Sequence, residues 1–457
     1  MIPRTRFVSA LAGLCLALFS CSVPGMLATL PATAVPTLPP LSADTSTLAP
    51  LPADTPAPTP SATPTLASTD TPSLPPAPVA PTPTLGGPAI AHLVPGQKID
   101  IMNIHMIDAN QGWGIGGVNK ASDHVFRTAD GGQTWRDVTP PQPAPAAGVS
   151  FSGMGYFLDA DTAWVAYGYP ADSAGMPPFL LVWKTEDGGN KWTYGSIDTS
   201  VVSGEAFSPY YFTFTDTRHG WLMVYLGAGM MHAYVALFMT NDGGVTWTDI
   251  LDPYTVNDIQ SFPKTGMVFV DSQTGWLTRD ANGVDPSPHI FRTSDGGATW
   301  TRLDLPAPAD VPNLFDSYAC GSYSPNAFSA TSVTITLKCL DNATYKTEKD
   351  YTYFTGDGGG TWQTHPLPAG YVFGEGVYFS SPQSGLALGR KIYQTSDAGK
   401  TWTFVQQVTW DGQFSFLKAA GTDLAWASGV NDQGETGLVT TQNGGKTWKL
   451  FHPIVVP

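Results

Sequence analysis

One eight-residue pattern recurs seven times in this chain and limits its possible folds more than any other feature. The first copy reads Thr128-Ala-Asp-Gly-Gly-Gln-Thr-Trp135. Successive copies lie between 40 residues apart (Asp357 to Asp397) and 62 residues apart (Asp295 to Asp357). Their central residues are Asp130, Asp187, Asp242, Asp295, Asp357, Asp397 and Asn443. A motif repeated at such intervals indicates one structural unit built seven times.

The residue types in this pattern are those of a tight β-hairpin. Gly-Gly follows the Asp in most copies, and glycine adopts the positive φ that such turns need. The carboxylate can accept backbone N–H groups within the turn, and the Trp offers a large apolar face to a neighbouring unit. A catalytic or metal-binding role would require the same active site seven times. We therefore interpret the seven central residues as structural.

A second turn signature precedes each copy. It reads Asp108-Ala-Asn-Gln-Gly-Trp113 in the first unit and recurs at Gly220-Trp221 and Gly275-Trp276. It is weakest in the fifth unit, from Ser329 to Thr334. Short apolar runs precede these turns, so each unit predicts four short antiparallel strands. The chain is therefore expected to be all-β, a single seven-bladed β-propeller with four-stranded antiparallel blades.

Together the two signatures resemble a known repeat. The eight-residue pattern resembles the Asp-box, or bacterial neuraminidase repeat (BNR), of sialidases, sortilin-type receptors and several glycanases. Its pairing with the Gly-Trp turn is most similar to the photosystem II stability/assembly factor type of propeller, and the resemblance covers residues 97–451. It implies the propeller fold. It implies no particular activity, because one fold hosts many unrelated functions.

The amino-terminal residues have the layout of a secretory signal peptide. Arg4 and Arg6 precede an apolar stretch that ends at Phe19, and Leu18-Phe-Ser-Cys21 resembles a lipoprotein cleavage site. Residues 1–21 are therefore predicted to be a signal peptide with a lipobox, and Cys21 is predicted to carry the lipid. Cleavage after Ala34 is the alternative.

The next segment, residues 22–88, is dominated by Pro, Thr, Ala and Ser. Such a composition cannot form a packed core, so we predict a disordered linker that acts as an extended stalk. The propeller then occupies residues 89–457. This order predicts an extracytoplasmic lipoprotein at a bacterial cell surface or in the periplasm, anchored to the membrane and carrying a monomeric head.

Charge and cysteine content narrow the partners further. The net charge of −15 argues against nucleic acid, which favours basic surfaces. Cys320 and Cys339 lie outside the leader, and an even pair in an oxidising compartment predicts a disulfide between the first two strands of blade five. His and Cys residues at metal-ligand spacing are missing from the sequence, so neither a metal site nor a cofactor is predicted.

Ligand binding is expected on one face of the propeller. In a four-stranded blade, both turn signatures emerge on the same side, which we call the box face. The irregular connections emerge on the opposite side, the loop face, and variable loops on a rigid scaffold commonly bind ligands. Candidate residues on or near the loop face include Tyr210, Tyr211, Tyr254, Arg279, Asp280, His289, Arg390 and Trp410.

Four of these residues are predicted ligand contacts: Trp410, Tyr211, Tyr254 and Arg390. Trp410 is the one tryptophan without a role in the repeat. A sialidase needs an arginine triad, and only Arg279 and Arg390 are placed to meet a ligand, so no catalytic residues are assigned. The sequence thus predicts a non-catalytic binding or assembly propeller for a protein or glycan ligand. A glycoside hydrolase or a carbohydrate-binding protein is the alternative.

Overall fold

The computed structural model describes most of the chain from Pro88 onward. The described residues are 88–145, 151–168, 179–202, 204, 206–229, 232–251, 258–260, 263–280, 287–344, 348–368, 376–388, 391–407, 413–420, 423–430, 436–444 and 446–457. The signal peptide with Cys21, and the linker up to residue 87, lie outside them. No helix in the described ranges is long and apolar enough to cross a membrane.

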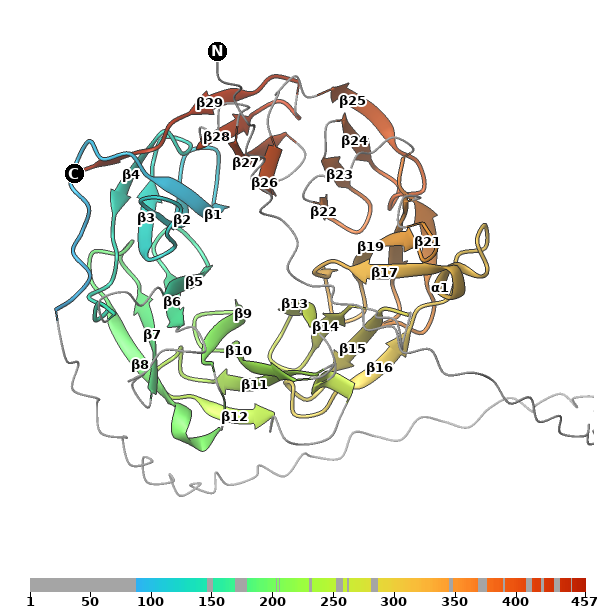
Figure 1. Cartoon of the computed structure of the whole chain (residues 1–457), viewed down its shortest axis with the longest axis horizontal. Helices are drawn as coiled ribbons and strands as arrows, with labels where there is room; N and C mark the ends of the chain where they lie inside the picture. Colours follow the sequence, from blue (N-terminus) through green and yellow to red (C-terminus); the bar gives the residue numbers. More distant parts are fainter. Residues whose placement is uncertain are drawn as a thin grey trace, which may run out of the picture. The chain divides into compact units, whose positions relative to one another are not determined.

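The described residues form seven sheets arranged as a ring of blades. In five blades the sheet is an antiparallel meander of four strands, whereas blade one adds β30, which pairs in parallel with β4, and blade five adds the short strand β18. Figure 1 shows the first strands of blades one to four (β1, β5, β9 and β13) facing the centre of the ring, with the fourth strands outside. The domain is therefore an all-β, seven-bladed propeller, and the fold expected from the repeats is confirmed.

The strands of blades one to four follow the order expected from the turn signatures. Blade one contains β1 (Asp100–Met106), β2 (Gly112–Gly117), β3 (His124–Thr128), β4 (Thr134–Asp137) and β30 (Ile454–Val456). Blade two contains β5 (Ser152–Phe157), β6 (Ala163–Gly168), β7 (Phe179–Thr185) and β8 (Thr193–Asp198). Blade three contains β9 (Ser208–Phe214), β10 (Gly220–Gly229), β11 (His232–Thr240) and β12 (Thr248–Leu251). Blade four contains β13 (Lys264–Phe269), β14 (Gly275–Arg279), β15 (His289–Thr293) and β16 (Thr301–Asp304).

The remaining blades keep this order. Three of the connections between blades contain a short helix. Blade five contains β17 (Tyr318–Ser322), β18 (Asn326–Ala327), β19 (Val333–Asp341), β20 (Glu348–Thr355) and β21 (Gln363–Pro366). Blade six contains β22 (Gly376–Phe379), β23 (Gly385–Leu388), β24 (Lys391–Thr395) and β25 (Thr403–Gln407). Blade seven contains β26 (Gln413–Ala420), β27 (Leu424–Val430), β28 (Thr436–Thr441) and β29 (Lys449–Phe451). The helices are η1 (Thr199–Val201), η2 (Asp258–Gln260) and α1 (Leu314–Ser317).

Each box turn is held by the same hydrogen bonds. In all seven boxes, the backbone N–H four residues after the central Asp or Asn donates to its Oδ1 atom over 2.8–2.9 Å. The glycines of the first box have φ of 76° and 96°, which an L side chain rarely adopts. Ala398 takes the first of these positions in the sixth box, with φ of 63°.

The two turn signatures of each unit are joined on one face. The backbone N–H that follows each central Asp or Asn donates to a carbonyl of the upstream turn over 2.8–3.0 Å, in all seven blades. The upstream Trp then links neighbouring blades. Trp164 Nε1 donates to the Gly243 carbonyl of the next box, and the indole of Trp164 stacks on Phe214 of the next blade at 3.7 Å. The hydrophobic core therefore lies between the blades, where these tryptophans are fully buried.

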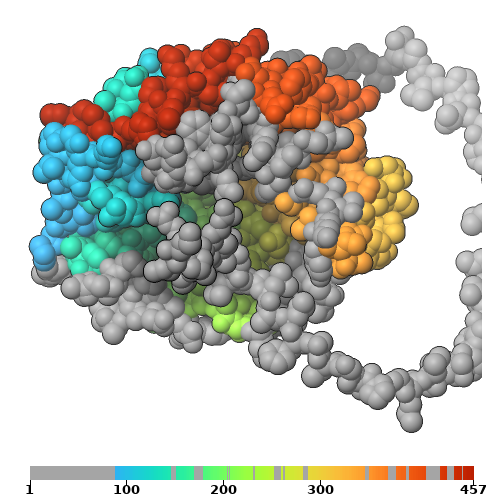
Figure 2. Space-filling model, turned by 45° about the horizontal axis from the view of Figure 1, so that its top comes forward, coloured from blue at the N-terminus to red at the C-terminus, as the bar shows by residue number. Residues whose placement is uncertain are grey.

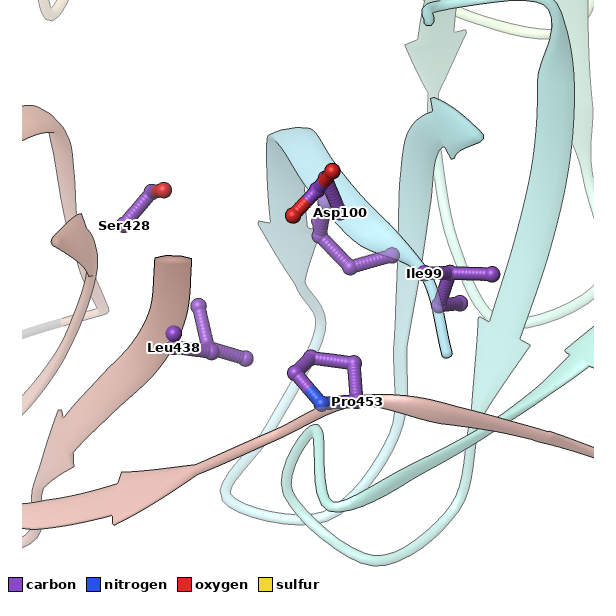
Figure 3. Close-up of a pocket in the computed structure, with 7 residues that line it drawn as sticks. Ile99, Asp100, Ser428, Leu438 and Pro453 are labelled. Atoms are coloured by element: carbon purple, nitrogen blue, oxygen red, sulfur yellow. The ribbon is translucent and has the colours of Figure 1, made fainter. Parts of the chain in front are cut away.

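The ring closes through both ends of the domain. Strand β30 pairs in parallel with β4 of blade one, and the Val455 backbone exchanges hydrogen bonds with Gly96 and Gln97. Figure 2 shows the C-terminal residues (red) against those of the first blade (blue). At the seam, Leu438 of blade seven and Pro453 lie beside Ile99 (Figure 3). Trp426 Nε1 of blade seven also donates to the Gly131 carbonyl of blade one over 3.0 Å.

Blade five, whose turn signature is the weakest of the seven, has an interrupted first strand. As a result, β17 and β18 pair in succession with β19. Cys320 on β17 and Cys339 on β19 are register partners, their Cα atoms are 4.0 Å apart and their sulfur atoms are in bonding contact. Both side chains are buried in the core between blades four and five.

Candidate functional site

The candidate site is a group of polar residues near the loop-face ends of the inner strands of blades three to five. We call it the blade-four polar cluster, and its members are Tyr210, Tyr211, Lys264, Arg279, Asp280 and Ser322. It contains one of the four predicted contacts, Tyr211. The other three, Tyr254, Arg390 and Trp410, lie outside the described residues, so a shared site for the four stays a prediction.

A β-bulge places two tyrosines side by side. Opposite β10, Met223 pairs with Tyr211 and Val224 pairs with Pro209, so Tyr210 is an additional residue in β9. In a regular strand, consecutive side chains point to opposite faces, and a bulge redirects them. Here both hydroxyl groups donate to the backbone carbonyl of Lys264 over 2.8 Å, and the ring centroids are 4.7 Å apart. Both side chains are half-buried.

Lys264 connects blades three and four from a buried position. Its side chain is 2% exposed, and its Nζ atom donates to the carbonyl of Ala233 on β11 over 3.1 Å. Burial, and then the charge of its register partner Arg279, lower the pKa of Lys264 to about 7. The ammonium group is disfavoured because few solvent molecules reach it. Lys264 was not among the residues predicted from the sequence. A lysine at the first position of an inner strand, in Pro263-Lys-Thr-Gly266, is the signal that could have indicated it.

Asp280 connects blades four and five. Its Oδ1 atom accepts the backbone N–H of Ser322 over 3.0 Å, and its own N–H donates to the carbonyl of Pro263 over 3.3 Å. Burial raises the pKa of Asp280 to about 6, and the hydrogen bond from Ser322 offsets only part of this effect. The Ser322 hydroxyl adds a contact to the Arg279 carbonyl over 3.3 Å. Lys264 and Asp280 therefore change charge near neutral pH.

Two of the loop-face candidates, Arg279 and His289, are instead part of the interior. Arg279 is 2% exposed and His289 is fully buried. The reason is their register: they pair with each other across β14 and β15, and Arg279 also pairs with Lys264 on β13, inside the sheet. Arg279 is therefore not available on the surface, and the expectation that it meets a ligand directly is wrong.

The blade-four polar cluster can bind polar groups of a ligand. Among the described residues, it does not provide all the side chains that a catalytic site would need. Asp280 is a buried carboxyl with a raised pKa, which is typical of general acids. Glycoside hydrolysis requires a second carboxylate nearby, and the blade-four polar cluster contains only the carboxyl of Asp280. The described residues likewise hold no group of three His, Cys, Asp or Glu side chains able to bind a metal ion.

Comparison with known proteins gives likeness at the level of the fold. No protein-family model matches the chain, and no curated protein matches it. A solved structure of YCF48 bound to a D1 peptide is 16% identical, covers 79% of this chain and 99% of that chain, and has a TM-score of 0.47. An alpha-L-arabinanase from Penicillium chrysogenum complexed with arabinobiose is 9% identical, with coverage of 66% and 96% and a TM-score of 0.39.

A third solved structure adds a lectin to this group. The Aleuria aurantia lectin, as a mutant in complex with Fucalpha1-6GlcNAc, is 10% identical, covers 78% of this chain and 96% of that chain, and has a TM-score of 0.37. The three proteins differ in what they bind. Likeness of fold therefore assigns no function to this chain, and its function must be argued from its own residues.

Proposed function

We propose that this protein is a non-catalytic binding propeller that captures a segment of a partner protein on its loop face. The observation that carries the proposal is the bulge at Tyr210, which presents two half-buried tyrosines together beside Asp280. Tyrosine is enriched in protein interfaces because its ring is large and rigid while its hydroxyl stays polar. No equivalent pair occurs in the repeated turns of the box face, where the polar groups bond to one another.

The test is a search for peptide ligands, followed by mapping. The purified chain is panned against a display library of random peptides and, in parallel, applied to a glycan array. We expect enriched peptides whose affinity falls by about tenfold or more, roughly 1.4 kcal/mol, in Tyr211→Ala and in Asp280→Ala. Gln133→Ala is the matched control, because Gln133 is an exposed residue of a box turn.

Three results would contradict the proposal. Peptide binding that is unchanged by both loop-face substitutions would place the site elsewhere. Binding to glycans alone would favour a carbohydrate-binding protein. Turnover of arabinan, xyloglucan or a sialoside, lost in Asp280→Asn, would favour a glycoside hydrolase. The raised pKa of Asp280 is the one observation that favours this last alternative.

We further propose that the propeller acts outside the cytoplasm, tethered through a lipid on Cys21 and the Pro/Thr-rich linker. The support is the order of a basic region, an apolar region and a cleavage-site motif in the sequence. Metabolic labelling with a fatty acid tests this tether: we expect incorporation in the wild type and none in Cys21→Ala. Equal labelling of both proteins would refute it.

We also propose that Cys320 and Cys339 form a disulfide in the mature protein. An oxidising compartment allows the bond to persist, and the Cα separation of 4.0 Å leaves the two side chains within bridging reach.

A further inference from the structure

A short segment at the start of the propeller crosses the edge of blade one. We call residues 88–93 the strap. Two backbone–backbone hydrogen bonds hold it: Ile90 N–H donates to the Gln142 carbonyl over 2.9 Å, and Ala144 N–H donates to the Pro88 carbonyl over 2.8 Å. In a third bond, Leu93 N–H donates to the side-chain carboxylate of Asp137 over 2.8 Å. The strap is thus attached mainly to residues that follow β4.

One buried histidine also contacts the strap. His124 begins β3 and is 6% exposed. Its Nδ1 atom lies 2.7 Å from Oδ1 of Asp123, and its Nε2 atom lies 3.3 Å from the carbonyl oxygen of Ala91 and 3.8 Å from Oδ2 of Asp137. Every polar atom that the ring faces at these distances is therefore a hydrogen-bond acceptor.

This geometry suits only one protonation state of the imidazole. A neutral ring has one N–H and one lone pair, so one of its nitrogens would face an acceptor without a proton. The imidazolium ion donates from both nitrogens. We propose that His124 is a proton-operated clasp: the charged ring holds the strap on blade one, and loss of the proton releases the contact with Ala91.

The contact with Ala91 is the one that deprotonation removes. Asp123 is the closer partner and its hydrogen bond is charge-assisted, so a neutral ring retains the Nδ1 proton. The Nε2 lone pair then faces the Ala91 carbonyl and the Asp137 carboxylate, and both interactions become repulsive. Asp137, whose side chain is 3% exposed, loses its nearest positive charge at the same time.

The charges around His124 favour the protonated ring. Burial by itself lowers the pKa of His124, but the hydrogen bond to Asp123 and the charges of Asp137 and Asp123 outweigh burial and leave the pKa raised. The other titratable groups nearby are the hydroxyl of Tyr167 on β6, which senses both carboxylates, and His92 on the strap, which bonds to the Thr139 carbonyl. With a raised folded-state pKa, the clasp is fully present below about pH 6.5 and is lost as the pH rises through that folded-state value.

Release of the strap changes a groove on the loop face. The groove has a volume of about 560 Å³ and lies where blades one and two meet. Ile90 and Ala91 of the strap form one side of it, and Asp123, Phe151 and Ser152 are among its other lining residues. The clasp therefore links the protonation of a buried histidine to the shape of this groove.

Hydrogen exchange measured by mass spectrometry on the purified chain tests the clasp. The readout is the protection of the strap amides, which include the donors Ile90 and Leu93, between pH 5 and pH 8.5 after correction for intrinsic exchange. We expect protection to fall by about tenfold as the pH rises, as for a local opening reaction. Residues 128–135 of the first box serve as the internal control and should show no such change.

Substitutions identify the group responsible. His124→Gln should abolish the pH dependence of strap protection. His92→Gln should retain it, because His92 faces no carboxylate among its hydrogen-bond partners. Asp123→Asn should move the transition to lower pH, since it removes the charge that favours the imidazolium. Two results would overturn the proposal: strap protection in the wild type that does not change with pH, or the same pH dependence in His124→Gln. The first result concerns the wild type alone, so it holds even if one variant folds poorly.

Discussion

The aspartates of the box turns and Asp280, which lies near the loop face, have opposite pKa shifts. In the box turns, hydrogen bonds from the backbone N–H and hydroxyl of Thr361 lower the pKa of Asp357 to about 2, and Asp397 has a similar value for similar reasons. Near the loop face, burial raises the pKa of Asp280 to about 6. The charged carboxylate is thus stabilised by hydrogen bonds in the box turns and destabilised by burial at Asp280, between blades four and five. The box turns, which recur in every blade, support the fold. The strongly raised carboxyl pKa occurs instead at a contact that is not repeated.

Removal of the two cysteines should have the largest effect on the free energy of unfolding. Both cysteines lie in the half of blade five that is nearer the loop face. Cys320→Ala with Cys339→Ala should lower the free energy of unfolding by about 3 kcal/mol, as expected for a bridge that closes a loop of this size. The two positions are 19 residues apart in sequence. Denaturant unfolding measures the loss. Mass spectrometry of a non-reduced digest is the companion experiment, and two freely alkylated thiols in the wild type would contradict the bridge.

Loss of one box carboxylate should have the next largest effect. Asp130 accepts hydrogen bonds from the Thr134 N–H over 2.9 Å and from the Thr134 hydroxyl over 2.7 Å. Asp130→Ala should lower the free energy of unfolding by roughly 1–3 kcal/mol, because these donors lose their partner. Asp130→Asn is the matched control and should cost less, since Asn443 makes the corresponding bonds in the seventh box. Equal losses in the two variants, measured by chemical denaturation, would show that hydrogen bonding does not explain the turn.

Asp280→Asn should have the opposite sign. The folded-state pKa of Asp280, about 6, is above its ordinary value of 3.8, so its contribution to stability is complete below about pH 4 and is lost as the pH rises through 6. The amide has no charge to bury, so the variant should be more stable than the wild type at pH 7.5 by about 1–3 kcal/mol. Unfolding curves at pH 4 and pH 7.5 check this. A difference that is the same at both pH values would contradict the assigned cause.

Ala398→Gly should have the smallest effect on stability. It gives the sixth box the glycine that the other boxes have at this position. Ala398 has φ of 63°, in a position that glycine occupies in the other boxes. Glycine removes the steric penalty of this conformation, so the variant should gain about 0.5–1 kcal/mol in stability. Gly296→Ala in the fourth box is the reciprocal change and should lose a similar amount. Thermal melting of both variants measures the pair, and a loss in Ala398→Gly would contradict the argument.

The sequence predicts the fold well because the repeat encodes local physics. The Gly-Gly turn, the flanking Thr residues and the buried Trp act within one blade or between neighbours, so spacing alone identifies them. The interruption of the first strand of blade five was not predicted, although the turn signature is weakest there. Ring closure by β30 was not predicted, because residues 454–456 follow the last box and carry no repeat signature.

The candidate site was only partly predictable, for two physical reasons. The bulge at Tyr210 depends on how β9 pairs with β10, and one additional residue in a strand leaves no distinct pattern. The burial of Arg279 depends on neighbouring strands, whereas residue type alone suggested a surface position. His124 was missed for a similar reason: its acceptors Asp137 and Ala91 are brought to it by β4 and by the strap.

The parallel pairing of β30 with β4 sets an order on synthesis and folding. Val455 pairs with Trp135, which the ribosome adds far earlier, and long-range contacts of this kind form late because a large loop must close first. Until then, β4 is an outer edge strand, as the fourth strands of the other blades remain in the finished fold. Blades two to seven can each assemble from their own residues as they emerge. The first blade to be made is therefore the last to be completed.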